Sequence, residues 1–110
     1  MRDVFLFKKG GEVSKFVCGS VIVDCGAEEV LGVEVIGYSI LSGRISSLSD
    51  FDWLCEKVIS VNYDAEVDVL SFQIVFGVNI TQRSGEGLFG FDECGRLVSF
   101  RFIDPCGLNE

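Results

Sequence analysis

The sequence contains no histidine, and positive charge is scarce in it. Without imidazole, the chain alone cannot build a Ser–His–Asp triad, a Cys–His pair or a histidine zinc site. Nine Lys and Arg stand against seventeen Asp and Glu, for a formal net charge of −8. Such a chain repels phosphate backbones and anionic lipid, which argues against nucleic acid and membrane surfaces as partners. These absences argue against an enzyme, and no motif implies a cofactor.

The chain also lacks a long apolar run. The N-terminal region has only four consecutive apolar residues, too few for the apolar stretch of a signal peptide. The longest apolar-rich stretch, Val30 to Leu41, contains Glu34 and is shorter than the roughly 20 residues of a membrane-spanning helix. We therefore expect a cytoplasmic protein.

No two of the five cysteines form a C-x-x-C pair, so neither a structural zinc site nor a thioredoxin-like motif has support. Buried thiols are the favoured interpretation, and the alternative is that some pair as disulfides, as occurs inside hyperthermophile cells. The cysteines are Cys18, Cys25, Cys55, Cys94 and Cys106.

What the sequence has is apolar strand-like runs between glycines and acidic residues, with 48% hydrophobic residues, thirteen Gly and ten Phe. Alternating apolar patterns favour strands, and glycine tolerates the positive φ of tight turns. The runs are Val4 to Phe7, Val13 to Val17, Val21 to Val23, Val30 to Ile36, Val67 to Phe76, Val78 to Gln82, Leu88 to Phe91 and Leu97 to Ile103. We expect a mainly β fold of two related four-stranded antiparallel meanders, forming a sandwich or a partly closed barrel.

One helix is predicted at about 48–59, joining the two halves. Phe51, Leu54, Cys55 and Val58 recur at the spacing of one helical face. Trp53 points away from that stripe, about 200° from Phe51 at 100° per residue. Because tryptophan is favoured at interface hot spots, Trp53 is a candidate partner contact, and the alternative is that it caps a sheet end.

The two halves resemble one another. Val30 to Ile36 aligns without a gap on Leu97 to Ile103, and Asp3 to Phe7 matches Asp68 to Phe72 with three identities. We interpret residues 1–110 as a single domain of two pseudo-repeats, about 1–42 and 60–108.

The register of the third strand between the repeats stays open. Asp24 aligns with Asp92 or, shifted by two residues, with Gly90.

The stretch Tyr63 to Leu70 resembles the opening signature of a family of small prokaryotic proteins known as domain of unknown function 2283. Phe91 to Val98, followed by Phe100 to Asp104, is similar to that family's closing hairpin, so the likeness covers about residues 60–105. The chain departs from the pattern at Ser99 and Arg101, where the family usually has Gly and Glu.

The first half carries Gly32 to Ile36, which fits the family pattern better than the second half does. The resemblance implies a small β-rich domain and supplies no established activity, cofactor or catalytic residue. Some members are encoded beside small toxin-like proteins, which implies a protein-binding role.

Asp64, Glu66 and Asp68 alternate, so on a strand their carboxylates would share one face. Such a cluster could hold Ca²⁺ or Mg²⁺ or share a proton, with Asp24 or Asp92 as a possible addition. The alternative is an acidic turn that keeps a strand entry solvated.

Glu34 and Arg101 occupy equivalent places in the two halves. We expect either a charge pair across a pseudo-twofold axis or two unrelated surface charges.

The leading functional hypothesis is a non-enzymatic protein-interaction or oligomerisation module, a homodimer or the partner of a small toxin-like protein. The alternative is a small-ligand or divalent-metal-binding protein that uses the carboxylate cluster.

Overall fold

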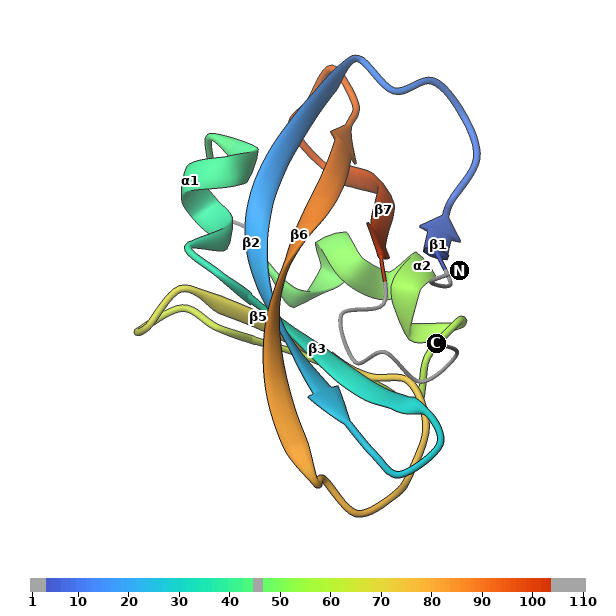
Figure 1. The fold of residues 1–110 in the computed structure, drawn as a ribbon. Helices are drawn as coiled ribbons and strands as arrows, with labels where there is room; N and C mark the ends of the chain where they lie inside the picture. The colour runs from blue at the N-terminus through green and yellow to red at the C-terminus, as the bar shows by residue number, and fades with distance from the viewer. Residues whose placement is uncertain (1–3, 45–46, 104–110) are drawn as a thin grey trace.

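The strands of the computed structural model form one curled antiparallel half-barrel sheet, which confirms the mainly β prediction (Figure 1). The structure describes residues 4–44 and 47–103. The elements are β1 (Val4–Lys8), β2 (Lys15–Cys25), β3 (Val30–Ile36), α1 (Tyr38–Ser42), the 3-10 helix η1 (Leu48–Phe51), α2 (Asp52–Cys55), β4 (Ser60–Asp64), β5 (Val69–Gln73), β6 (Thr81–Phe91) and β7 (Leu97–Ile103). The strand order across the sheet is β1-β7-β6-β2-β3-β5-β4.

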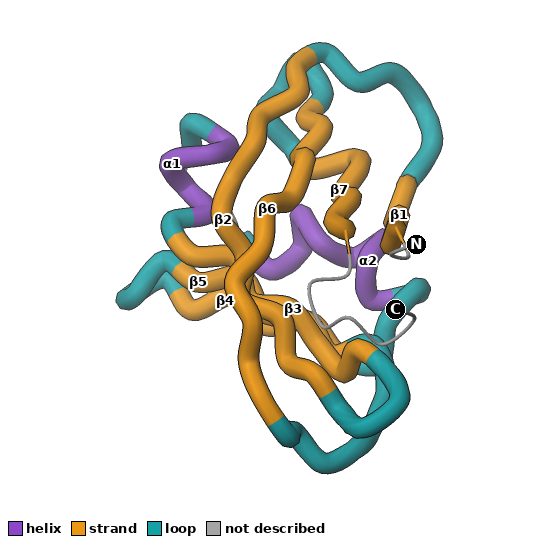
Figure 2. Tube along the Cα trace, in the orientation of Figure 1, coloured by secondary structure: helices purple, strands orange, loops and turns teal. Residues whose placement is uncertain are grey.

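The two halves do not form the separate four-stranded meanders that we expected. β1 lies beside β7, the last strand, and β5 lies beside β3, so the strands of the two halves are interleaved in one sheet. The centre of the sheet is the long pair β2 and β6, which are hydrogen-bonded from Lys15 opposite Phe91 to Cys25 opposite Thr81. Figure 2 shows these two strands running side by side along the length of the molecule.

Seven strands form instead of eight. Two pairs of predicted runs are continuous, in β2 and in β6, whereas β4 was not predicted. β2 passes straight through Gly19, which lies between two of the predicted runs. A Cβ added at Gly19 would lie 2.7 Å from Cδ1 of Leu41 and 3.0 Å from Cε2 of Phe89. Glycine therefore lets the α1 side of the molecule pack directly onto the strand, rather than bending the chain.

The core lies on the inner face of the curled sheet. Alternate strand residues point inward, and Val23, Phe89 and Phe100 are fully buried there. The rings of Phe89 and Phe100 lie 4.8 Å apart between centroids, in a tilted pair. Phe51 and Leu54 from the helical segment are also fully buried, so η1 and α2 cover this core.

Two ladders of the sheet correspond in register. Asp24 pairs with Gly32 directly before a register shift in the β2–β3 ladder, and Gly90 pairs with Ser99 directly before a shift in the β6–β7 ladder. Asp24 and Gly90 thus stand at the same place relative to these two register shifts.

The outer ladders correspond in the same way. Glu34 pairs with Ser71 between β3 and β5, and Arg101 pairs with Leu6 between β7 and β1. β4 continues the sheet beyond β5 and has no counterpart beyond β1 in the described chain.

The helix predicted at about 48–59 exists only as a 3-10 turn followed by one α-helical turn, which ends at Cys55. Lys57 and Val58 both donate their backbone N–H to the Leu54 carbonyl, which turns the chain toward β4. Cys55 is exposed, so only part of the predicted apolar stripe faces the core.

The sequence did not predict α1. Gly37 and Gly43 flank it with φ values of 71° and 75°, a conformation that glycine adopts without strain. No helix within the described ranges is long and apolar enough to cross a membrane.

Candidate functional site

The carboxylates of Asp64, Glu66 and Asp68 do not share a strand face. β4 ends at Asp64, and residues 65–68 form the turn of the β4–β5 hairpin. The backbone N–H of Glu66 donates to Oδ1 of Asp64 at 3.0 Å, and both side chains are exposed. The predicted cluster is therefore an acidic turn, as the structural alternative had it.

Asp68 is the last residue of that turn, and its side chain contacts the start of α1. It has a φ of 55°, a left-handed conformation that Asp tolerates better than most residues. Its carboxylate accepts hydrogen bonds from the Ser39 backbone N–H at 2.9 Å, the Ser39 hydroxyl at 2.7 Å and the Tyr63 hydroxyl at 2.5 Å. Because Gly37 has no capping side chain, Asp68 caps α1 from the neighbouring hairpin.

This hydrogen bonding shifts two pKa values. Burial raises the pKa of Asp68, but the hydrogen bonds from Tyr63 and Ser39 outweigh it and leave that pKa below its ordinary value. The hydrogen bond to Asp68, together with burial and the nearby negative charge, raises the pKa of Tyr63 to about 12. Asp68 therefore stays ionised at neutral pH, and its carboxylate links the β4–β5 hairpin to α1.

The other predicted members of a metal site lie elsewhere. Asp24 is on β2, and Asp92 accepts hydrogen bonds from the backbone N–H groups of Cys94 and Arg96 in the β6–β7 turn. Those bonds, led by that from Arg96, lower the pKa of Asp92. In the part of the chain that the structure describes, no group of three or more Cys, Asp or Glu side chains could hold a metal ion.

Trp53 is half-buried and packs against the core. Its indole Nε1–H donates to the Leu97 carbonyl at 2.8 Å. The side chain thus ties α2 to the start of β7 within the chain, while its role as a partner contact stays a prediction.

Glu34 and Arg101 occupy equivalent positions on β3 and β7, but they do not pair within the chain. β2 and β6 lie between these strands, and the two residues are also staggered by four residues along that central pair, so three strand spacings and about 13 Å along the strands separate their backbones. Of the two alternatives, a charge pair within the chain is therefore contradicted, and the two residues are separate surface charges there.

The thiols of Cys18, Cys55 and Cys94 are free and exposed, contrary to the expectation of buried thiols. Cys25 is buried and disulfide-bonded, as the alternative had it for some of the cysteines. Cys106 lies outside the described residues.

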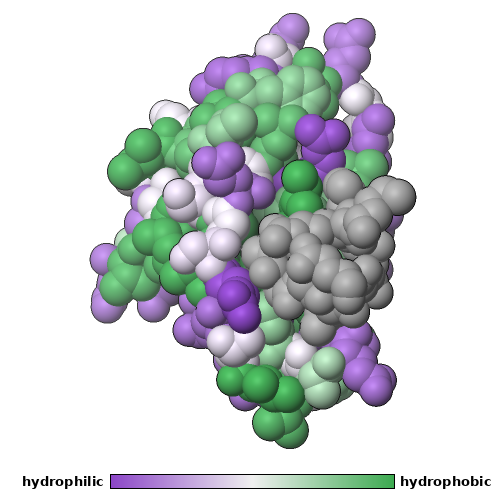
Figure 3. All heavy atoms as spheres, viewed as in Figure 1, coloured by the Kyte–Doolittle hydropathy of each residue, from purple (hydrophilic) through white to green (hydrophobic). Residues whose placement is uncertain are grey.

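The most exposed apolar side chains lie on the connection from β5 to β6, here called the 74–80 segment. Phe76 is 73% exposed, Val78 is 83% exposed and Ile80 is 63% exposed. In Figure 3, hydrophobic residues gather at the lower end of the molecule, where Figure 1 places this connection. Grouped apolar side chains of this size on a surface are typical of a protein contact.

The 74–80 segment is held at both ends. Ile74 and Val75 donate backbone N–H groups to the Leu31 carbonyl, and Ile80 donates to the Cys25 carbonyl. In the middle, a Cβ added at Gly77 would lie 2.7 Å from Cδ2 of Leu31, so the segment lies directly on that buried side chain. The exposed residues are therefore presented on an anchored backbone.

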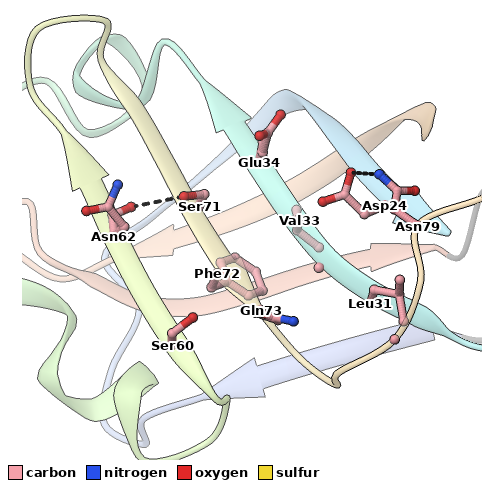
Figure 4. A pocket seen from close by; sticks show the side chains of 12 residues that line it. Asp24, Leu31, Val33, Glu34, Ser60, Asn62, Ser71, Phe72, Gln73 and Asn79 are labelled. Carbon is pink, nitrogen blue, oxygen red and sulfur yellow. Dashed lines mark hydrogen bonds between the residues drawn. The ribbon is translucent and has the colours of Figure 1, made fainter. Parts of the chain in front are cut away.

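A groove on the outer face of the sheet, the face opposite the core, lies next to this segment (Figure 4). Its volume is about 320 Å³. We call it the acidic groove, because Asp24 and Glu34 are its charged residues; its polar lining also includes Ser60, Asn62, Ser71, Gln73 and Asn79. Gln82 donates to Oδ1 of Asp24 at 2.7 Å, and Gly32 leaves the floor open between the two carboxylates.

Neither the 74–80 segment nor the acidic groove was predicted from the sequence. Val67 to Phe76 and Val78 to Gln82 alternate like half-buried strands, and the pattern does not show that residues 74–80 have no neighbouring strand. Comparisons with protein-family models, curated proteins and solved structures find no match to this chain.

Proposed function

We propose that this protein is a non-enzymatic protein-interaction module that contacts its partner through the 74–80 segment. The observation that carries the proposal is the exposure of Phe76, Val78 and Ile80 on a segment anchored at both ends. A partner that buries them gains hydrophobic free energy, on the order of 25 cal/mol per Å² of apolar surface. Because the backbone is already held, little conformational entropy opposes binding.

The surroundings of the segment define the partner's chemistry. A hollow of about 260 Å³ between the segment and the β2–β3 turn is lined by Val78, Ile80 and Leu31, and its charged residues are Glu28 and Glu29. A complementary surface therefore has an apolar anchor with basic groups beside it.

The test is affinity capture from extracts of the source cells with a matched control. Phe76→Ser combined with Val78→Ser removes the apolar surface, whereas Ile40→Ser removes a side chain that is equally exposed, at 83%, on α1. We expect one basic protein in stoichiometric amount on the wild type and on Ile40→Ser, and its loss on the double variant. Equal capture by all three proteins, or none by the wild type, would contradict the proposal.

We also infer that the chain arose by duplication, as its two halves suggest. The corresponding registers of the β2–β3 and β6–β7 ladders support this, as do those of the β3–β5 and β7–β1 ladders. The resemblance to domain of unknown function 2283 stays a proposal. Its test is the structure of a half-length relative from that family. Its β-strands should pair in these same registers.

A further inference from the structure

The acidic groove holds two carboxylates that no cation of the described chain neutralises. Asp24 and Glu34 are the charged residues of its lining, and neither forms an ion pair with a residue that the structure describes. The hydrogen bonds that Asp24 accepts within the described ranges come from Asn79 and Gln82, and both go to Oδ1. Oδ2 of Asp24 and the whole Glu34 carboxylate are therefore left for a ligand.

The two carboxylates are spaced so that one cation can lie between them. Asp24 pairs with Gly32 in the β2–β3 ladder, and Glu34 lies two residues further along β3. Diagonal neighbours of this kind lie about 7 Å apart on one face of a sheet. A Cβ at Gly32 would lie 3.7 Å from Oδ2 of Asp24, so the glycine keeps this space open. Figure 4 shows Glu34 on β3 and Asp24 beside Asn79.

The acidic groove adjoins the surface of the proposed function. The hollow lined by Val78, Ile80 and Leu31, here called the apolar hollow, shares Leu31 and Gly77 with the groove. Gly77 has no side chain that could divide the two. A partner that inserts an apolar side chain into the apolar hollow therefore reaches the acidic groove with a neighbouring side chain.

We propose that the acidic groove binds an arginine side chain of the partner, next to an apolar side chain that enters the apolar hollow. This inference rests on the proposed function, and it names the basic group that the partner carries. A guanidinium has five N–H donors in one plane, so one group can hydrogen-bond to Asp24 and Glu34 together. The ammonium of lysine is a compact, strongly hydrated charge and matches this pair less well.

The geometry of an extended chain sets the partner's sequence pattern. Alternate side chains of an extended segment point to the same side and lie roughly 7 Å apart. An apolar residue two positions from the arginine therefore enters the apolar hollow while the guanidinium lies in the groove. The peptide acetyl-Leu-Ala-Arg-Ala-Leu-amide has this spacing on both sides of the arginine, so it satisfies the pattern in either chain direction.

Titration of this peptide, followed by two-dimensional amide NMR at low salt, tests the inference. A second peptide replaces arginine with citrulline, its uncharged isostere. We expect shifts at Gly32 and Glu34, and a Kd about tenfold higher for the citrulline peptide, because a charge-assisted contact is lost. On Glu34→Gln the arginine peptide should lose about tenfold in affinity, and its advantage over citrulline should fall to about threefold or less, because the two changes remove the same contact.

Three controls isolate the guanidinium contact. Glu56→Gln removes an exposed carboxylate that lines neither the groove nor the apolar hollow, and it should leave both Kd values unchanged. A lysine peptide keeps the charge and should bind about threefold more weakly than the arginine peptide. Phe76→Ser combined with Val78→Ser should weaken the arginine and citrulline peptides equally, because it removes only apolar surface. Circular dichroism verifies the fold of every variant.

The inference is overturned if the arginine peptide does not bind, or if the citrulline or lysine peptide binds as tightly. An arginine preference that persists on Glu34→Gln overturns it as well. The proposed function fails separately, when Phe76→Ser with Val78→Ser captures the same partner from extracts as the wild type. Capture that depends on Phe76 and Val78 but not on Glu34 would keep the proposed function and reject the arginine site.

Discussion

Replacing Asp68 with Asn tests whether one carboxylate holds the β4–β5 hairpin onto α1. The carboxylate accepts hydrogen bonds from the Ser39 N–H, the Ser39 hydroxyl and the Tyr63 hydroxyl. Asn keeps the shape and tolerates the φ of 55°, but it offers one acceptor oxygen and turns a donating NH₂ toward these donors. The substitution therefore isolates charge and hydrogen bonding from backbone strain.

The magnitude follows from the hydrogen bonds that are lost. A hydrogen bond to a charged group contributes roughly 1.5–3 kcal/mol net, and a donor left without a partner costs a comparable amount. Because the site is only part-buried, we expect Asp68→Asn to lower the free energy of unfolding by about 2 kcal/mol. In a domain of this size that lowers Tm by roughly 10 °C.

Urea denaturation at several pH values is the assay, with Asp64→Asn as the control in the same turn. The folded-state pKa of Asp68 lies below its unfolded value. Its contribution is therefore present above the unfolded pKa and is lost as the pH falls through the folded pKa. The gap between the wild type and Asp68→Asn should be constant near neutral pH and close under acid conditions. A gap below about 0.5 kcal/mol, one equal to that of Asp64→Asn, or one that persists in acid would refute the reasoning.

Three further predictions concern the core and its edges. The phenol of Tyr63 should titrate at about 12 by ultraviolet absorbance; because its pKa is raised on folding, its contribution is complete below the ordinary value of 10.0 and falls as the pH rises from there to about 12. Gly19→Ala should cost about 1–3 kcal/mol in urea denaturation, because its Cβ would meet Leu41 at 2.7 Å; a neutral result would mean that Leu41 moves freely. Trp53→Phe should cost about 1 kcal/mol more than the lost area explains, because the Leu97 carbonyl loses its donor; stability equal to the wild type would show that water replaces the bond.

The sequence predicts the bounds of a strand well where the signals are local to that strand. The runs Val30 to Ile36 and Leu97 to Ile103 coincide with β3 and β7, because alternation and flanking turn residues are local signals. It does not predict the exchange of strands between the halves, because pairing of β1 with β7 depends on contacts across nearly the whole chain.

Of the two interpretations of the carboxylate cluster, a shared strand face fails for a different physical reason. Asp64 to Asp68 alternates like a strand, but the side chain of Asp64 binds the Glu66 N–H, which closes a turn. The tendency of Asp to form such turns and to tolerate positive φ was the signal that could have placed Asp68 outside the strand. Its contact with Ser39 is tertiary, and no local pattern contains it.

The pairing of the first strand with the last also sets the order in which the chain can fold. As synthesis proceeds, β1 emerges first and has no partner until β7 has left the ribosome, whereas β2 and β3 can form their hairpin at once. Closing the long intervening loop costs entropy that only the completed sheet repays. Folding should therefore be slow for a chain of this length, on the order of milliseconds to seconds. Until then, the apolar segment Val4–Lys8 has no strand partner, and a chaperone or another nascent copy can bind it.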